Sequence, residues 1–353
     1  MSTYLEISSA GAYASIQDLG RFGYRRIGVP WSGVLSPRLM RIANRLAGND
    51  DLHPVIECFD GGQQLRAGET PVRVAVAGDA SLEISSEDGP RQVAAWRSFV
   101  LQQGETLRIS RIAPGRIAVV ALAGLDLPRM LGSASTYARA ALGGDRGRAL
   151  AAGDRLPAAA CTGGAERTLT SPPDPERTPI RLVAGPQHQH FIDEAWTTLL
   201  GAEYRISAAA DRMGIRLEGP ALTHAPQFGH EIISDATVPG AIQVPGNGQP
   251  IVLLADAQTA GGYPKIATVI SADLPRLAAL RPGETVRFAA VSAAEGERLA
   301  RLAESHTRAL LDAVRDIPGT GIDIAALYSN NLVGGAISAL AEEYRPLATS
   351  FTG

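Results

Sequence analysis

Four polar side chains follow a short apolar segment of the chain. Residues Ile251–Ala255 are expected to form a buried strand, and Asp256, Gln258, Tyr263 and Lys265 come directly after it. Asp256 then lies at a sheet edge, and Gln258 faces the same way if the strand continues. Together these groups can hold an amide or a carboxylate and stabilise an oxyanion, with Asp256 as acceptor or general base.

Each of these side chains also has an ordinary structural interpretation. Asp256 could cap a turn, Tyr263 could be a core aromatic, and Lys265 could be a solvated charge at a strand edge. Lys265 nevertheless stands out, because it is the only lysine among 33 basic residues. An ammonium and a guanidinium differ in hydration and donor geometry, so a lone lysine marks a position to examine.

Two further segments carry arginine beside glycine. Arg212 and Arg216 lie on either side of Gly214, where they either grip a carboxylate together or form structural ion pairs with Asp211 or Glu218. Near the N-terminus, the segment Ser15–Arg21 contains Gln17, Asp18 and Arg21, which either cap a first turn or line a second pocket.

Histidines do not complete a metal site in the sequence. His188 and His190 have the spacing of a ligand pair, but no nearby Cys or third His joins them. Cys58 and Cys161 form neither a ligand pair nor a disulfide framework, which favours a reducing compartment. We therefore predict no bound metal.

Composition excludes several classes of function. The net charge is -3 and no Lys/Arg cluster is present, so neither nucleic acid nor an anionic membrane is an expected partner. No apolar run approaches the roughly 18 residues that span a bilayer, which predicts a soluble cytoplasmic protein. The sequence lacks a Gly-x-x-x-x-Gly-Lys-Ser/Thr loop and a Met-Lys-Met segment, so any ATP or biotin should be brought by another polypeptide.

Periodicity and turn residues predict a mainly β protein. Alternating apolar residues from 72 to 122 indicate strands, whereas three- and four-residue spacing predicts helices at 36–46, 191–200 and 292–317. Residues 162–179 are rich in Pro and polar side chains and are predicted to be a linker that forms neither ladder nor helix. The predicted organisation is an N-terminal barrel-like domain at 1–161, this linker, a second domain at 180–290 that carries the site, and a helical tail at 291–353.

Several segments together resemble the allophanate hydrolase subunit 2 family. They are Ser15–Arg21, Ala43–Asn49, Gly132–Thr136, Asp211–Gly214, Gly240–Asp256, Gln258–Ile266 and Ile270–Leu274. The resemblance covers about residues 4 to 290. It implies two cyclophilin-like β-barrel domains, to which the sequence adds a C-terminal helical extension.

The resemblance also implies a function and partners. Related proteins include the C-type subunit of an ATP-dependent 5-oxoprolinase and the biotin-dependent carboxyl-transfer domain of urea carboxylase, and members act with a subunit 1/B-type companion. Ala257 replaces the Arg expected of the urea carboxylase branch, which favours opening of 5-oxoproline to glutamate, alongside an A-type companion of the LamB/YcsF kind. Carboxyl transfer from biotin on another polypeptide to urea or a related small amide is the alternative. A regulatory binding protein that antagonises a kinase inhibitor is a second alternative.

The combined assignment has two groups of residues. The expected catalytic residues are Asp256, Gln258, Tyr263 and Lys265, and the expected substrate-binding residues are Arg212, Arg216, Gln243, Gln17, Asp18, Arg21 and His188.

Overall fold

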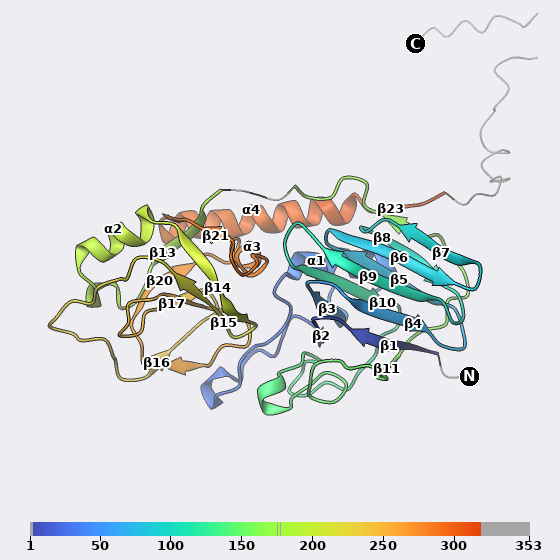
Figure 1. Cartoon of the computed structure of the whole chain (residues 1–353), viewed down its shortest axis with the longest axis horizontal. Helices are drawn as coiled ribbons and strands as arrows, with labels where there is room; N and C mark the ends of the chain where they lie inside the picture. The colour runs from blue at the N-terminus through green and yellow to red at the C-terminus, as the bar shows by residue number, and fades with distance from the viewer. Residues whose placement is uncertain (1–2, 175, 177, 319–353) are drawn as a thin grey trace, which may run out of the picture. The chain divides into compact units, whose positions relative to one another are not determined.

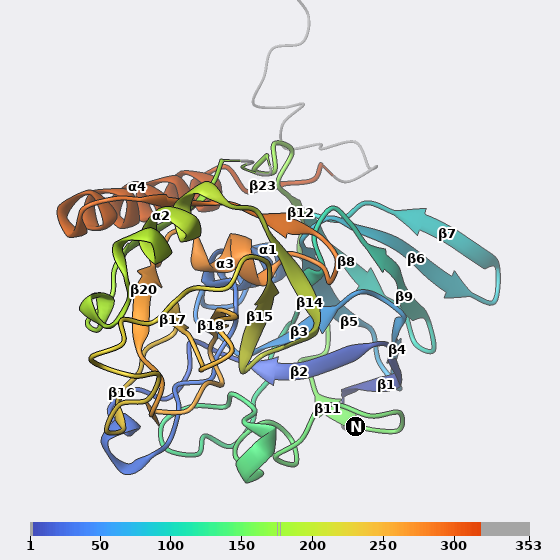
Figure 2. The ribbon, with the colours of Figure 1, turned by 60° about the vertical axis from the view of Figure 1, so that its left-hand side comes forward.

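The computed structural model describes residues 3–174, 176 and 178–318 (Figures 1 and 2). By their mutual contacts, Met1–Asp316 form one compact unit. Within this unit we call residues 3–161 the N-terminal half and residues 180–290 the C-terminal half.

Two sheets form the N-terminal half. The first has the order β11-β1-β4-β9-β6-β7, with β1 Tyr4–Ala10, β4 Gln63–Ala67, β6 Ala80–Ser86, β7 Gly89–Val93, β9 Thr106–Ile112 and β11 Arg155–Pro157. The second has the order β2-β3-β10-β5-β8-β12-β23, with β2 Tyr13–Gln17, β3 Val55–Phe59, β5 Val72–Ala77, β8 Arg97–Leu101, β10 Ile117–Leu122, β12 Arg167–Thr168 and β23 Arg315–Asp316.

The central strands of the second sheet, such as β5 and β10, are buried on both faces. Val74 and Val120 belong to the core shared with the first sheet, whereas Ala75 and Ala121 pack against α1 (Pro37–Ala47). Because neighbouring residues of a strand point to opposite faces, double burial requires an apolar residue at almost every position. The continuous apolar run predicted as a buried strand is thus β10.

One eight-stranded sheet forms the C-terminal half. Its order is β21-β14-β15-β18-β17-β20-β13-β22, with β13 Ile180–Ala184, β14 Tyr204–Asp211, β15 Gly214–Glu218, β17 Ala241–Gln243, β18 Ile251–Leu253, β20 Lys265–Val269, β21 Thr285–Val286 and β22 Phe288–Ala290. The short pair β16 Asp235–Ala236 and β19 Ala260–Gly261 lies outside it. The remaining helices of this half are α2 Asp193–Gly201, α3 Leu274–Ala278 and the 3-10 turn η3 His188–His190.

The mainly β, barrel-like fold predicted from the sequence is confirmed, since the strands of both halves curve around apolar cores (Figure 2). The halves also share apolar contacts. Leu35, Phe59 and Ile117 of the N-terminal half belong to the same buried cluster as Leu254 and Ala278 of the C-terminal half. This shared cluster explains why the two halves form one compact unit.

The predicted start and end of the first helix and the predicted start of the last agree with the structure. α1 begins after Ser36, whose Oγ accepts a hydrogen bond from the Leu39 amide, and it ends at Gly48 with a φ of 87°. The capping pair Ser292 and Glu295 starts α4 (Ala293–Asp312) as predicted. α4 packs along β13 and α1 (Figure 1).

Two predictions about extended structure were wrong. The predicted linker contributes β12, in which Thr168 pairs with Arg97 of β8, so this polar segment does join a ladder. The last predicted helix ends at Asp312 and not at Ile317, because Arg315 and Asp316 form β23 and pair with β12. Tertiary strand pairing therefore overrides the helical periodicity there. Of the predicted helical tail, residues 319–353 lie outside the described residues.

No helix in the described part of the chain combines the length and the apolar character that crossing a membrane requires.

Candidate functional site

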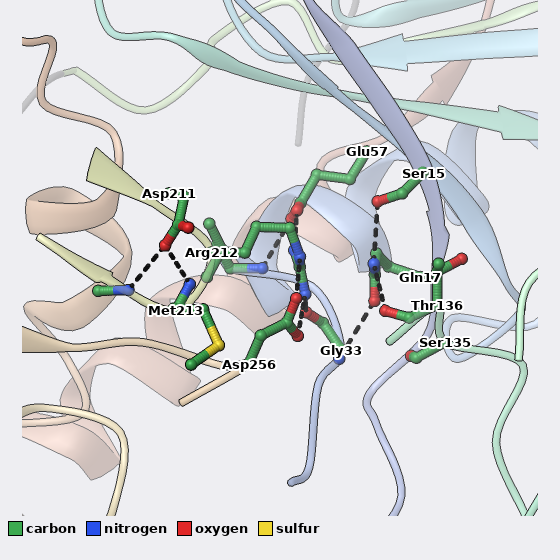
Figure 3. Close-up of polar contacts among 12 residues, drawn as sticks. Ser15, Gln17, Gly33, Glu57, Ser135, Thr136, Asp211, Arg212, Met213 and Asp256 are labelled. Carbon is green, nitrogen blue, oxygen red and sulfur yellow. Dashed lines mark hydrogen bonds and ion pairs between the residues drawn. The ribbon is translucent and has the colours of Figure 1, made fainter. Parts of the chain in front are cut away.

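A buried group of three charged side chains joins the two halves. Arg212 donates from Nε to Asp256 Oδ2 at 3.0 Å and from Nη2 to Asp256 Oδ1 at 3.2 Å (Figure 3). Its Nη1 donates to Glu57 of β3, and Nη2 also donates to the Gly33 carbonyl oxygen at 2.5 Å. Every nitrogen of the guanidinium is therefore engaged. We call Arg212, Asp256 and Glu57 the charged triad.

A tight turn aims Arg212 at this position. Asp211 ends β14, and its Oδ1 accepts hydrogen bonds from the amides of Met213 at 2.7 Å and Gly214 at 3.2 Å. The amide of Asp256 donates to the Arg212 carbonyl oxygen at 2.9 Å, so backbone and side chain both connect these two residues. Asp256 follows β18 and is only 7% exposed.

Burial and charge act against each other in the triad. Burial raises the pKa of Glu57, and although Arg212 lowers it, the pKa stays above its ordinary value. Burial lowers the pKa of Arg212, but Asp256 and Glu57 outweigh burial and the pKa is raised. The guanidinium therefore remains charged, while burial holds the pKa of Glu57 above its ordinary value.

Lys265 lies in a second polar group within the C-terminal half. Its Nζ lies 2.8 Å from Asp235 Oδ2, although the lysine is only 2% exposed. Gln187 links the pair, because it accepts from the Lys265 amide at 3.2 Å and donates to Asp235 at 3.1 Å. The hydrogen bond from Lys265 holds the pKa of Asp235 below its ordinary value.

Two glutamine side chains lie next to this second polar group. Gln258, two residues after Asp256, donates from Nε2 to Gln243 Oε1 at 2.9 Å. Gln243 in turn donates to the Tyr263 carbonyl oxygen at 3.5 Å and lies opposite Lys265 in the pairing of β17 and β20. Among the predicted catalytic residues, Asp256 and Lys265 thus belong to separate buried ion groups, whereas Tyr263 is 40% exposed.

Gln17 and Asp18 form a third polar group in the N-terminal half. Asp18 accepts hydrogen bonds from the Gly20 and Ala134 amides and from the Ser133 and Ser135 hydroxyls, at 2.5 to 2.8 Å. Burial raises the pKa of Asp18, but these donors prevail and lower it. Asp18 therefore both caps its own turn and fastens residues 133–135 to the end of β2.

Gly33 lies between this third group and the triad (Figure 3). Its amide donates to Gln17 Oε1 at 3.2 Å, and its carbonyl oxygen accepts from Arg212. The neighbouring Ser32 amide donates to the Ala255 carbonyl oxygen at 3.0 Å. The junction of the halves is thus lined by hydrogen-bonding groups from both sides.

Some predicted residues lie apart from this arrangement. Arg212 does not pair with Asp211 or Glu218, and Arg216 is exposed on β15, because strand alternation turns it away from the buried Ile215 and Leu217. The shared grip of two arginines is therefore a wrong prediction.

His188 packs edge-on against Trp196, with ring centroids 4.7 Å apart. Among the described residues, no three His, Cys, Asp or Glu side chains gather as a metal site would require.

Glu57 and Asp235 were missed by the sequence interpretation. Glu57 carried a usable signal, because it is a charged residue inside the otherwise apolar strand Val55–Phe59. Asp235 lies in a polar loop, and only the fold brings it to Lys265.

The chain thus has a mainly β fold of two barrel-like halves that meet at a charged, polar junction. The chain belongs to the carboxyltransferase domain family with subdomains A and B, which matches residues 27–290.

Relatives in this family include the C-type subunits of two bacterial 5-oxoprolinases. The chain is 38% identical over 318 residues to the one from Haemophilus influenzae, covering 89% of this chain and 98% of that protein. It is 36% identical to the one from Escherichia coli, covering 82% and 92%.

Larger eukaryotic proteins match over part of their length. Urea amidolyase of Lachancea kluyveri is 29% identical over 81% of this chain but only 17% of that protein. The crystal structure of K. lactis urea amidolyase superimposes with a TM-score of 0.76 at 27% identity, covering 88% of this chain and 20% of that one.

Proposed function

We propose that this chain is the C-type subunit of a cytoplasmic, ATP-dependent 5-oxoprolinase assembly that opens 5-oxoproline to glutamate. The main support for this proposal is the match to the Haemophilus influenzae protein, which covers 98% of that protein. In contrast, the match to urea amidolyase covers about one sixth of a much longer chain. The subunit designation of the bacterial relatives also supports the existence of companion chains, for which we propose a subunit 1/B-type protein and an A-type protein of the LamB/YcsF kind.

The C-terminal half supplies groups that suit a small lactam. Lys265 and the amides of Gln243 and Gln258 can donate to a carbonyl oxygen, where an oxyanion develops during attack on an amide. Asp256 can accept a proton or a hydrogen bond, since each carboxylate oxygen keeps a lone pair beyond its bond to Arg212. Glu57 positions Arg212 and so acts on Asp256 indirectly.

We infer that the ATP triphosphate is held mainly by another chain. A phosphate-binding loop needs glycines and a lysine at the start of a helix, and the one lysine of this sequence lies in β20, paired with Asp235. Any biotin would likewise be carried elsewhere, because this sequence has no Met-Lys-Met segment.

Reconstitution tests the proposal. The chain is co-expressed with a subunit 1/B-type and a LamB/YcsF-type protein from the same organism, and glutamate release from 5-oxoproline is measured with ATP while each chain is omitted in turn. We expect release that requires this chain. A well-formed complex that releases no glutamate would refute the proposal.

Carboxyl transfer is the second candidate, favoured by the family match and by the TM-score of 0.76 to urea amidolyase. It predicts ATP-dependent fixation of labelled bicarbonate onto urea or a small amide in the presence of a biotin carrier. Fixation without glutamate release would establish this candidate in place of the first.

A further inference from the structure

Arg21 is a buried guanidinium with unfilled donors. The side chain follows β2 and is 1% exposed, and its Nη2 donates to the Ser135 carbonyl oxygen. Nε and Nη1 are buried without a hydrogen-bond partner, and no carboxylate among the described residues lies within ion-pair distance. Arg212, by comparison, has a partner at every nitrogen. Burying charged donors without partners destabilises a folded protein, so we expect an acceptor to bind Arg21.

The open part of Arg21 has the geometry of a carboxylate binder. A guanidinium presents two edges that each carry two parallel donors, one formed by Nε and Nη2 and the other by Nη1 and Nη2. Ser135 takes one of the two Nη2 hydrogens, so one complete two-donor edge remains free whichever hydrogen it takes. Planar oxyanions match such an edge with two hydrogen bonds.

Two hydroxyl groups nearby are also unfilled. Thr136 Oγ1 and Ser32 Oγ are buried and have no partner, and Thr136 follows the residue that holds Arg21. Ser32 belongs to the segment paired with Arg21, since the Arg21 amide donates to the Trp31 carbonyl oxygen at 2.8 Å. We call Arg21, Ser32 and Thr136 the Arg21 group.

Two glycines lie close to Arg21 and Thr136. A Cβ on Gly143 would lie 2.6 Å from Arg21 Nη2, and a Cβ on Gly144 would lie 2.3 Å from Thr136 Oγ1. Both glycines have φ values near +64°, which other residues adopt at a cost. The backbone therefore approaches both polar groups closely and leaves little room, which suits a small oxyanion better than a large one.

The Arg21 group adjoins the charged triad. Ser32 donates from its amide to Ala255, the residue before Asp256. Burial lowers the pKa of Arg21, and the charges of Asp18 and Asp256 only partly oppose this. Asp18 accepts four hydrogen bonds from other groups and forms no ion pair with Arg21, so it does not serve as the missing acceptor.

We propose that Arg21, assisted by the hydroxyls of Ser32 and Thr136, binds the carboxylate of the small acid on which the junction acts. This inference rests on the proposed function, in which the substrate is a lactam that bears a carboxylate. Arg21 then sets specificity for the acid over a neutral lactam, while Asp256 and Lys265 face the amide.

The test compares 5-oxoproline with its neutral carboxamide in the assembled enzyme. Arg21→Met should raise KM for 5-oxoproline about 10- to 100-fold, the effect of losing a charged two-donor contact. It should change KM for the carboxamide little, so the preference for the acid should collapse. Arg108→Met is the matched control, because Arg108 is exposed on β9.

The outcomes are distinct. An unchanged preference in a folded Arg21→Met assembly would overturn the inference and leave the proposed function standing, whereas a wild-type assembly that releases no glutamate would refute the function itself. If Arg21→Met does not fold, Thr136→Val carries the test, with an expected loss of preference of about 5-fold and no loss as the contrary result.

Free phosphate is the competing oxyanion. Calorimetric titration of the wild-type assembly should show Arg21-dependent binding of 5-oxoproline. Binding of inorganic phosphate alone would overturn the inference.

Discussion

Arg212→Met should destabilise the folded protein by about 3–5 kcal/mol, because it leaves Glu57 and Asp256 buried without their shared counter-charge. Urea-induced unfolding of the single chain at pH 7 measures this loss as a change in the free energy of unfolding. A triple variant that adds Glu57→Leu and Asp256→Leu removes the buried charges altogether. It should recover most of the loss, since apolar replacement of a buried ion group is often neutral or stabilising.

The pH dependence checks the cause. Burial already raises the pKa of Glu57, and without Arg212 this effect is less opposed, so the pKa should rise further. A carboxyl group with a raised folded pKa contributes stability below its unfolded pKa and loses that contribution as pH rises through the folded value. The stability deficit of Arg212→Met should therefore grow as the pH rises above the ordinary titration range of a glutamate. A deficit below about 1 kcal/mol, or a triple variant as unstable as the single one, would refute the reasoning.

Three further predictions concern other parts of the site. Gly143→Ala should lower the midpoint of thermal unfolding more than Gly153→Ala does. A Cβ at position 143 would lie 2.0 Å from a backbone carbonyl oxygen, whereas a Cβ at position 153 would meet open space. Equal midpoints for the two variants would contradict this prediction. Asp18→Asn should destabilise most near pH 7, because hydrogen bonds hold the pKa of Asp18 below its ordinary value and the carboxylate loses its contribution as pH falls through the folded pKa. A stability gap that does not close in acid would count against this prediction. The assembly with Lys265→Arg should retain part of its glutamate release, whereas the assembly with Lys265→Met should lose it. Only the arginine keeps a cation beside Asp235. Equal activities of the two variants would argue against a cationic role for Lys265.

Local structure was largely predictable from the sequence. Ser36, Gly48 and Ser292 mark helix ends through cap chemistry that acts within a few residues, and the structure shows these caps. Buried strands such as Ile117–Leu122 follow from their apolar runs. The short strands β12 and β23 were not predictable, because each exists only through pairing with a partner distant in sequence.

The same distinction between local and long-range contacts applies to the site residues. Asp256, Gln258 and Lys265 could be proposed from the sequence because they lie close together after an apolar segment. The pairing of Arg212 with Glu57 was not found, since 155 residues separate the two and the contact depends on how the halves meet. Local charge spacing suggested Asp211 and Glu218 as partners, but the turn after β14 directs Arg212 into the junction.

The requirement for Asp256 tests the central claim most directly, namely that the junction of the two halves carries the ATP-dependent opening of 5-oxoproline. Glutamate release is measured in the full assembly containing Asp256→Asn, with assembly confirmed by size-exclusion chromatography and Asp88→Asn, in the exposed hairpin between β6 and β7, as the control. We predict a loss of at least about 100-fold for Asp256→Asn and little change for the control. Near-normal turnover by an intact Asp256→Asn assembly would contradict the claim.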